Sequence, residues 1–191
     1  MRDRKRLFFG ISVPETCRQS LIQWRAETFS ADVGRPVAAA NLHLTLAFLG
    51  DVSGEKAAAL QQLAARIRQP GFTLKLDDAG HWPRSGVVWL GPKQAPRGLL
   101  QLAQLLRSQA ARSGCYQSPL PFHPHVTLLR HVMQPVPLPP RNFCWQFPVE
   151  RFALYQSVTA RGRTRYDEIA GWALTQDVYE LLPRTAPGDA G

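Results

Sequence analysis

The chain has 191 residues, of which 45% are hydrophobic, and it can therefore bury the core of one large domain. Its 23 Lys and Arg residues outnumber its 14 Asp and Glu residues, and the formal charge of +9 favours a polyanionic partner such as a nucleic acid or a nucleotide. No apolar run approaches the roughly 18 residues that cross a bilayer, and the short run after the basic start lacks a signal-peptide cleavage site, which argues against a membrane protein.

The predicted elements alternate between strands and helices along most of the chain. In the first half we expect a strand at 7–13, a helix at 14–29, a strand at 41–50, a helix that starts after Ser53 and stops before Pro70, and strands at 72–76 and 87–90 separated by a Gly/Pro loop. In the second half we expect a helix at 96–112 and strands at 122–130, 143–147, 150–158 and 166–173. One domain over residues 1–182 and a flexible tail over 183–191 complete the prediction.

The cysteines indicate a cellular compartment. Cys17, Cys115 and Cys144 are odd in number and lack the Cys-x-x-Cys spacing of a zinc site. Reduced structural thiols are typical of cytoplasmic proteins. We therefore expect a cytoplasmic protein without a disulfide framework, and we expect it to be a monomer.

A short motif occurs twice in apolar, strand-like surroundings. The first copy is HLTL, with His43 and Thr45, and the second is HVTL, with His125 and Thr127. Because side chains alternate along a strand, the His and the Thr of each copy share one face, and the apolar residues between them point to the other. A single copy is most simply a core histidine beside a threonine, but a matched pair favours two similar lobes that present polar faces to one cleft.

Two imidazoles and two hydroxyls suit a displacement at phosphorus. Histidine titrates near neutral pH, so one copy can accept a proton from the attacking water while the other donates a proton to the leaving oxygen. The threonine hydroxyls can bind the non-bridging oxygens of the phosphate. The repeated motif therefore predicts metal-independent acid–base chemistry on a phosphate ester, with no cofactor.

The two motifs, the strand RLFFGISVP and the C-terminal TARGRTRY resemble the two-histidine phosphoesterases, in particular the bacterial RNA 2′,3′-cyclic phosphodiesterases, also called 2′-5′ RNA ligases. The resemblance extends to about Thr175. It implies an α+β fold of two pseudo-symmetric lobes, each with an antiparallel-rich sheet and outer helices, around a central cleft that carries one motif from each lobe.

The same resemblance implies an activity and a role for each histidine. The substrates would be RNA ends or nucleoside 2′,3′-cyclic phosphates, tRNA fragments among them, and the products would be 2′-phosphates. The reverse reaction would join RNA ends through a 2′-5′ linkage without ATP. By the family's pattern His43 would be the proton donor and His125 the proton acceptor.

Other polar clusters leave alternatives open. His123 and His125 have a spacing that can bind a metal, which would make a metal-dependent hydrolase, and a non-catalytic module that binds RNA or nucleotides through its histidines is a further alternative. Arg130 would point away from His125 in a regular strand, but a bulge would bring it to the rim of the cleft, where it could bind a nucleotide base.

The remaining candidates are less specific. Arg161, Arg163 and Arg165 fit a phosphate-binding strand or a solvated turn equally well. We expect the tryptophans to lie in the core, except that Trp82 could stack on a base.

Overall fold

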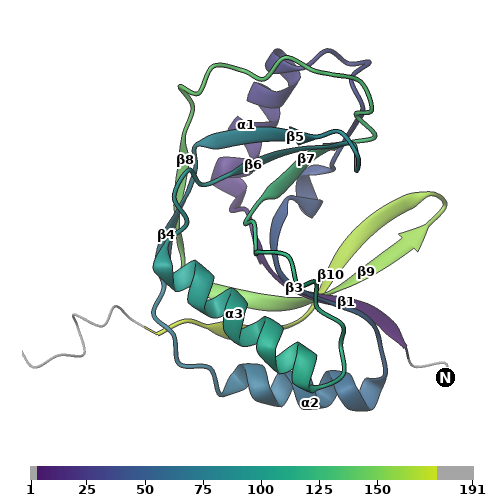
Figure 1. The fold of residues 1–191 in the computed structure, drawn as a ribbon, viewed down its shortest axis with the longest axis vertical. Coiled ribbons are helices and arrows are strands. Elements are labelled where there is room, and N and C mark those ends of the chain that lie inside the picture. The colour runs from purple at the N-terminus through teal and green to yellow at the C-terminus, as the bar shows by residue number, and fades with distance from the viewer. Residues whose placement is uncertain (1–3, 176–191) are drawn as a thin grey trace, which may run out of the picture.

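The computed structural model describes residues 4–175 (Figure 1). Its main sheet has eight strands in the order β10-β9-β1-β3-β7-β6-β5, with β2 paired to β7, and β4 and β8 form a separate two-stranded sheet. The strands are β1 (Lys5–Ser12), β2 (Arg35–Pro36), β3 (His43–Val52), β4 (Phe72–Leu76), β5 (Asp78–Trp82), β6 (Val87–Gly91), β7 (Val126–Arg130), β8 (Trp145–Val149), β9 (Arg151–Ala160) and β10 (Arg163–Ala173). The helices are α1 (Glu15–Thr28), α2 (Gly54–Ala65) and α3 (Arg97–Arg112), and a 3-10 turn, η1, spans Ala39–Asn41.

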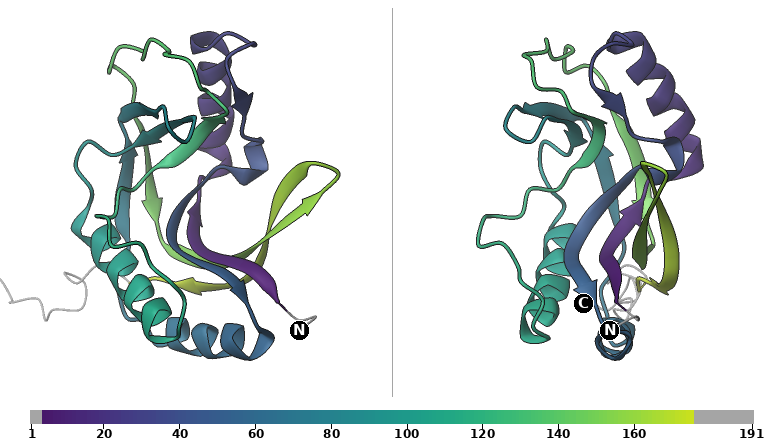
Figure 2. Two further views of the ribbon diagram at one scale, coloured as in Figure 1. Left: turned by 45° about the vertical axis from the view of Figure 1, so that its right-hand side comes forward. Right: turned by 90° about the vertical axis from the view of Figure 1, so that its right-hand side faces the viewer.

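The main sheet divides into two lobes. One lobe contains β10, β9, β1 and β3, and the other contains β7, β6 and β5 with β2 at its side. The paired residues that join β3 to β7 are Leu44 and Val126. Figures 1 and 2 show α2 and α3 at the base of the first lobe and α1 beside the second. This is the mixed, antiparallel-rich α+β fold with outer helices that the sequence predicts.

A single cluster of buried apolar residues connects the lobes. On β3, Leu44 and Leu46 are each 1% exposed, as strand alternation predicts for residues that face away from the histidine. Helix α3 packs against β3 through the predicted stripe of Leu99, Leu102 and Leu106, whereas Leu105 is 38% exposed. The lobes therefore share one core.

The buried guanidinium of Arg25 fastens α1 to the second lobe. Its Nη1 donates to the carbonyl oxygen of Val37 at 2.8 Å and to that of Leu128 at 3.2 Å. Leu128 lies on β7, next to one of the motif threonines. These bonds satisfy the buried charge and hold the strand that carries the second motif.

The predicted helices are confirmed with shifts of a few residues at their ends, except that α2 ends at Ala65, before the predicted stop. The Ser53 hydroxyl accepts a hydrogen bond from the backbone N–H of Lys56 and caps α2, as expected from the sequence.

Two strand predictions were wrong. Residues 78–82 form strand β5 rather than a loop, because all five pair with residues of β6. The glycine in this strand, Gly80, leaves room for the Trp89 ring to pack directly against its backbone. The strand predicted at 122–130 starts only at Val126, and Pro124, which has no N–H to donate to a ladder, precedes it.

Among residues 4–175, no helix is long and apolar enough to cross a membrane. The predicted tail at 183–191 lies outside the described residues, and the prediction of one domain over 1–182 extends past them as well.

Candidate active site

The two His-x-Thr motifs meet where the lobes join. Leu44 and Val126, the middle residues of the two motifs, are partners in the antiparallel pairing of β3 and β7. His43, Thr45, His125 and Thr127 all line one cleft of about 1060 Å³ between the lobes. Because the pairing is antiparallel, the register sets each histidine beside the threonine of the other motif. The two motifs therefore form one four-residue cluster, which we call the His-Thr cluster.

Hydrogen bonds to the main chain orient both imidazoles in the same way. Nδ1 of His43 lies 2.8 Å from the carbonyl oxygen of Asn41, and Nδ1 of His125 lies 2.8 Å from that of His123. A carbonyl oxygen only accepts, so each Nδ1 carries the hydrogen. Each Nε2 is consequently the unprotonated nitrogen of the neutral ring, which can accept a proton. In both motifs the bonded carbonyl belongs to the residue two positions before the histidine.

The hydroxyls of the His-Thr cluster differ in their contacts. Oγ1 of Thr45 lies 2.8 Å from Nε2 of His43, so that the hydroxyl donates to the neutral ring. Thr127 lines the same cleft from β7 and is partly exposed. Both hydroxyls are within the cleft, as the alternation of the motif predicts.

Aromatic rings pack on each histidine. The His43 ring lies 4.7 Å from the centroids of both Phe8 and Tyr166, and the His125 ring lies 4.7 Å from that of Trp82. Sequence reasoning missed Phe8 and Tyr166, which come from β1 and β10 and carry no motif of their own. Trp82 was the one tryptophan singled out as a binding residue, and it does line the cleft.

Burial changes the proton affinity of both imidazoles. Desolvation lowers the pKa of His43 to about 4. The bond to the Asn41 carbonyl opposes this shift, and the charges of Arg130 and His125 add smaller lowering contributions. Desolvation also lowers the pKa of His125. At neutral pH both rings are therefore neutral in the free protein, and each Nε2 can accept a proton.

The depressed pKa of His43 predicts a loss of stability in acid. Between about pH 6.5 and 4 the unfolded chain binds a proton at this position that the folded chain does not, so the free energy of unfolding falls as the pH falls through that window. We expect His43→Gln, which does not titrate, to reduce the loss between about pH 7 and pH 4.5 by up to about 2.5 kcal/mol. Urea unfolding of both proteins at the two pH values measures it. Equal losses in the two proteins would show that His43 is not desolvated.

The cleft is strongly basic. Its charged lining residues are arginines, and no carboxylate is among them. They are Arg6 on β1, Arg35 on β2, Arg130 on β7 and Arg163 on β10. Arg35 and Arg130 are cross-strand partners, so that two guanidiniums adjoin on one wall. A cleft of this charge favours a phosphate-bearing ligand.

A β-bulge brings Arg130 into the cleft. Val88 pairs with Leu129 and Trp89 with Thr127, which leaves Leu128 without a partner on β6. The extra residue reverses the alternation, and Arg130 turns toward the side occupied by Thr127. Arg130 therefore lies at the rim of the cleft, the position that the sequence predicts only for an irregular strand.

The three arginines near the C-terminus have separate surroundings. Arg161 and Gly162 form the turn between β9 and β10, with φ values of 54° and 75°. Arg163 lines the cleft, whereas Arg165 pairs with Asp167 at 3.1 Å. Figures 1 and 2 show this hairpin projecting from the sheet. Only one of the three can contact a ligand next to the His-Thr cluster.

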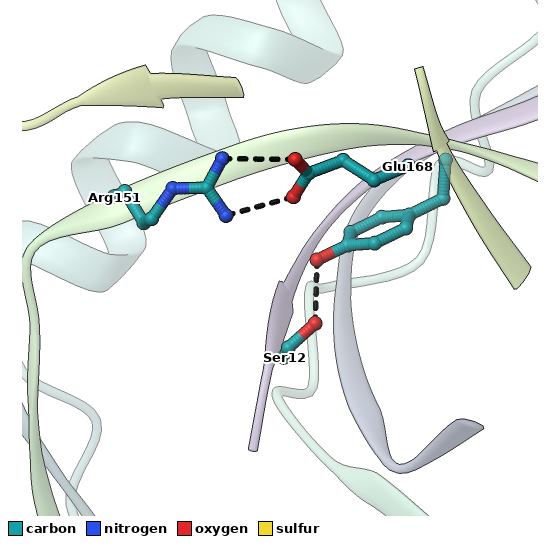
Figure 3. A network of polar contacts seen from close by, with 4 residues as sticks. Ser12, Arg151 and Glu168 are labelled. Carbon is teal, nitrogen blue, oxygen red and sulfur yellow. Dashed lines mark hydrogen bonds and ion pairs between the residues drawn. The ribbon is translucent and has the colours of Figure 1, made fainter. Parts of the chain in front are cut away.

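A polar network supports the strands next to His43. The Tyr155 hydroxyl bonds the hydroxyl of Ser12, which is the cross-strand partner of His43, and Arg151 forms a two-pronged pair with Glu168 (Figure 3). The Tyr155 ring stacks on Phe8 at 5.4 Å. Together these contacts connect β1, β9 and β10 around the aromatic residues on which His43 packs.

His123 and His125, the possible metal-binding pair, make contacts with aromatic rings instead, and the His125 ring bonds the main chain of His123. The ring of His123 packs against both Trp82 and Trp89, at 5.2 and 4.6 Å, and its carbonyl orients His125. In residues 4–175 no three His, Cys, Asp or Glu side chains form a group that could hold a metal ion. Nε2–H of His81 donates to the carbonyl oxygen of Val132.

Comparison with known proteins gives consistent matches. A model of the family described as LigT like Phosphoesterase matches residues 11–89. RNA 2′,3′-cyclic phosphodiesterase of Escherichia coli strain K12 is 62% identical over 176 residues, which are 92% of this chain and 100% of the relative. The protein of the same name from Thermus thermophilus is 34% identical over 165 residues, which are 80% and 81% of the two chains.

Solved structures agree in fold. The crystal structure of E. coli LigT complexed with 3′-AMP has a TM-score of 0.88 at 63% identity and covers 91% of this chain and 99% of that chain. The same protein complexed with phosphate has a TM-score of 0.84 at 59% identity, with the same coverage. With its paired His-x-Thr motifs at the junction of two lobes, the chain thus belongs to the LigT-like phosphoesterases of the two-histidine superfamily.

Proposed function

We propose that this protein is an RNA 2′,3′-cyclic phosphodiesterase that opens the cyclic phosphate to a 2′-phosphate by two-histidine acid–base catalysis. The observation that carries the proposal is the His-Thr cluster in a basic cleft, where carbonyl bonds hold the hydrogen of each imidazole at Nδ1 and leave each Nε2 unprotonated and able to accept a proton. The names of the E. coli and T. thermophilus relatives support the substrate class, as do the 3′-AMP and phosphate bound to E. coli LigT.

The proposed reaction is one displacement at phosphorus. A water oxygen forms a bond to phosphorus while the bond from phosphorus to the 3′-oxygen breaks. Nε2 of His125 takes a proton from the water, and the charged imidazolium of His43 gives its Nε2 proton to the 3′-oxygen. Protons exchanged with solvent then restore the starting state of both rings. Because the imidazoles supply both proton transfers, the proposed step uses no metal.

The neighbouring side chains would bind the phosphate and the nucleoside. The Thr45 and Thr127 hydroxyls can donate to the two non-bridging oxygens, and the arginines of the cleft stabilise the charge. The Thr45 hydroxyl would exchange its bond to His43 for one to the phosphate. Arg130, next to Arg35 on the wall of the second lobe, is placed to contact the terminal base.

We also propose a biological setting. The substrates would be RNA ends, with tRNA fragments among them, and attack by an RNA 5′-hydroxyl in place of water would give a 2′-5′ linkage. The three cysteines are free thiols, which supports a reducing, cytoplasmic location. We retain a monomer as the proposed state and residues 1–182 as one domain.

A non-catalytic RNA-binding module remains the second candidate, because the same basic cleft would suit it. Turnover of a nucleoside 2′,3′-cyclic phosphate in excess EDTA, with the product identified as the 2′-phosphate, separates the two. Binding without turnover would support the module. Turnover that EDTA abolishes would support a metal-dependent hydrolase.

The lowered pKa values predict a difference between two pH profiles. The acid must be charged, yet in the free protein the pKa of His43 is about 4, and that of His125 is lowered too. A bound anionic phosphate raises an adjacent histidine pKa by about 1–3 units. We therefore expect the alkaline limb of kcat to lie about one pH unit or more above that of kcat/KM, with apparent constants that describe the coupled pair.

Steady-state rates measured across pH with one cyclic mononucleotide check this. Coincident alkaline limbs would mean that the phosphate does not change the proton affinity of the rings.

A further inference from the structure

The cleft extends beyond the His-Thr cluster to an exposed aromatic side chain. Phe48 on β3 is 44% exposed and lines the cleft, although most other large apolar residues of that strand are buried. The guanidinium of Arg6 lies over its ring, 4.8 Å from the centroid. We call this pair the Phe48–Arg6 platform.

Strand irregularity explains why Phe48 faces the cleft. Thr45 pairs with Gly10 and Ala47 with Phe9, so that Leu46 is an extra residue in β3. The next pair is Phe48 with Phe8, whose ring contacts His43. Phe48 therefore shares a face with the His-Thr cluster, three residues or about 10 Å along the strand from Thr45.

The platform is held in place before any ligand binds. The Gln117 side-chain amide donates to the carbonyl oxygen of Phe48 at 2.7 Å and joins this part of β3 to the segment after α3. The ring of Phe48 is also the cross-strand neighbour of Phe8. A planar guanidinium on an aromatic ring gives a flat, positively charged surface.

The position of the platform separates it from the wall assigned to the terminal nucleoside. Arg130 and Trp82 belong to the second lobe, on β7 and β5, whereas Arg6 and Phe48 belong to β1 and β3 of the first lobe. A strand of RNA whose cyclic end lies at the histidines would continue from there along the basic cleft. Flat aromatic and arginine surfaces bind bases by stacking, with little dependence on base identity.

We propose that the Phe48–Arg6 platform is a second nucleotide site, which stacks the base of the nucleotide that precedes the cyclic phosphate end. Its guanidinium and that of Arg163, which lines the same cleft from β10 of the same lobe, balance the charge of the linking phosphate. The inference rests on the proposed phosphodiesterase function. It makes the protein selective for the ends of RNA chains over free cyclic mononucleotides.

The test compares two substrates, a nucleoside 2′,3′-cyclic phosphate and a dinucleotide with a 2′,3′-cyclic phosphate end, both in EDTA. We expect the unmodified protein to have the lower KM for the dinucleotide. Phe48→Ala raises that KM by about 5–150-fold, the effect of losing one stacked base, and leaves the KM for the mononucleotide within about twofold. Arg6→Gln raises the dinucleotide KM in the same direction, and Phe48→Tyr, which retains a ring, restores it.

Tyr116→Ala provides the matched control, because Tyr116 is 82% exposed and is not among the residues that line the cleft. It should change neither KM. If Phe48→Ala changed both substrates equally, or neither, the second nucleotide site would be wrong. Failure of the unmodified protein to turn over even the mononucleotide would instead contradict the proposed function.

Discussion

Replacing either His43 or His125 by Ala is expected to lower kcat for a nucleoside 2′,3′-cyclic phosphate by about 10²–10⁴-fold, because each change removes one proton transfer. His43 on β3 and His125, directly before β7, both line the cleft, and the buried core next to them is formed by other residues, Leu44 and Val126 among them. Folding should therefore change little. Initial rates at saturating substrate, with thermal unfolding as the check on folding, measure the effect.

The double variant and a control histidine make this result specific. His43→Ala with His125→Ala should lose less than the product of the two single losses, because residues that act in one step are not additive. His81→Asn is the control, since His81 bonds a main-chain carbonyl outside the lining of the cleft. A single histidine variant that kept more than about a tenth of the rate would have no acid–base role.

Thr45→Val and Thr127→Val should each reduce kcat/KM by about 5–150-fold, which corresponds to about 1–3 kcal/mol for a lost hydrogen bond to a charged group. Valine keeps the branched shape that suits a strand and deletes only the hydroxyl. Steady-state kinetics on the cyclic mononucleotide measure the loss, and Thr→Ser at each position should recover most of it.

The two threonine variants should differ in one respect. Thr45 also bonds Nε2 of His43, so Thr45→Val should shift the pH profile, whereas Thr127→Val should lower the rate at all pH values alike. Unchanged kinetics in both variants would limit the threonines to a structural role.

The His-Thr cluster was predictable because its signal is local and duplicated. Strand alternation alone places His43 and Thr45 on one face, and the second copy identifies the other half of the cluster. Even the meeting of the two motifs follows from the expectation of two lobes around one cleft. The pairing of Leu44 with Val126, which sets the register of the two motifs, could not be predicted from the motifs themselves.

The position of Arg130 could not be predicted from regular strand alternation. In an unbroken strand it would face away from Thr127, and only the bulge at Leu128 turns it to the cleft. The bulge depends on the pairing of β7 with β6, a contact between segments some forty residues apart. Local sequence carries no sign of it.

The aromatic residues around His43 were missed for a related reason. Phe8 and Tyr166 come from opposite ends of the described chain, and each is an ordinary residue of an apolar or mixed strand. Their contact with the imidazole appears only when β1, β3, β9 and β10 assemble. The lowered pKa of His43 arises from this burial, so it too could not be derived from the motif.

The central claim is that His43 donates and His125 accepts a proton on opposite sides of one phosphate. An aryl ester of a nucleoside 2′-phosphate, with a nitrophenolate leaving group that needs no proton, tests it most directly. We expect His43→Ala to recover most of the unmodified protein's rate on this ester and His125→Ala to remain at least about 10²-fold slower. Rescue of His125→Ala instead would reverse the two roles, and equal losses of both variants on both substrates would contradict the acid–base account.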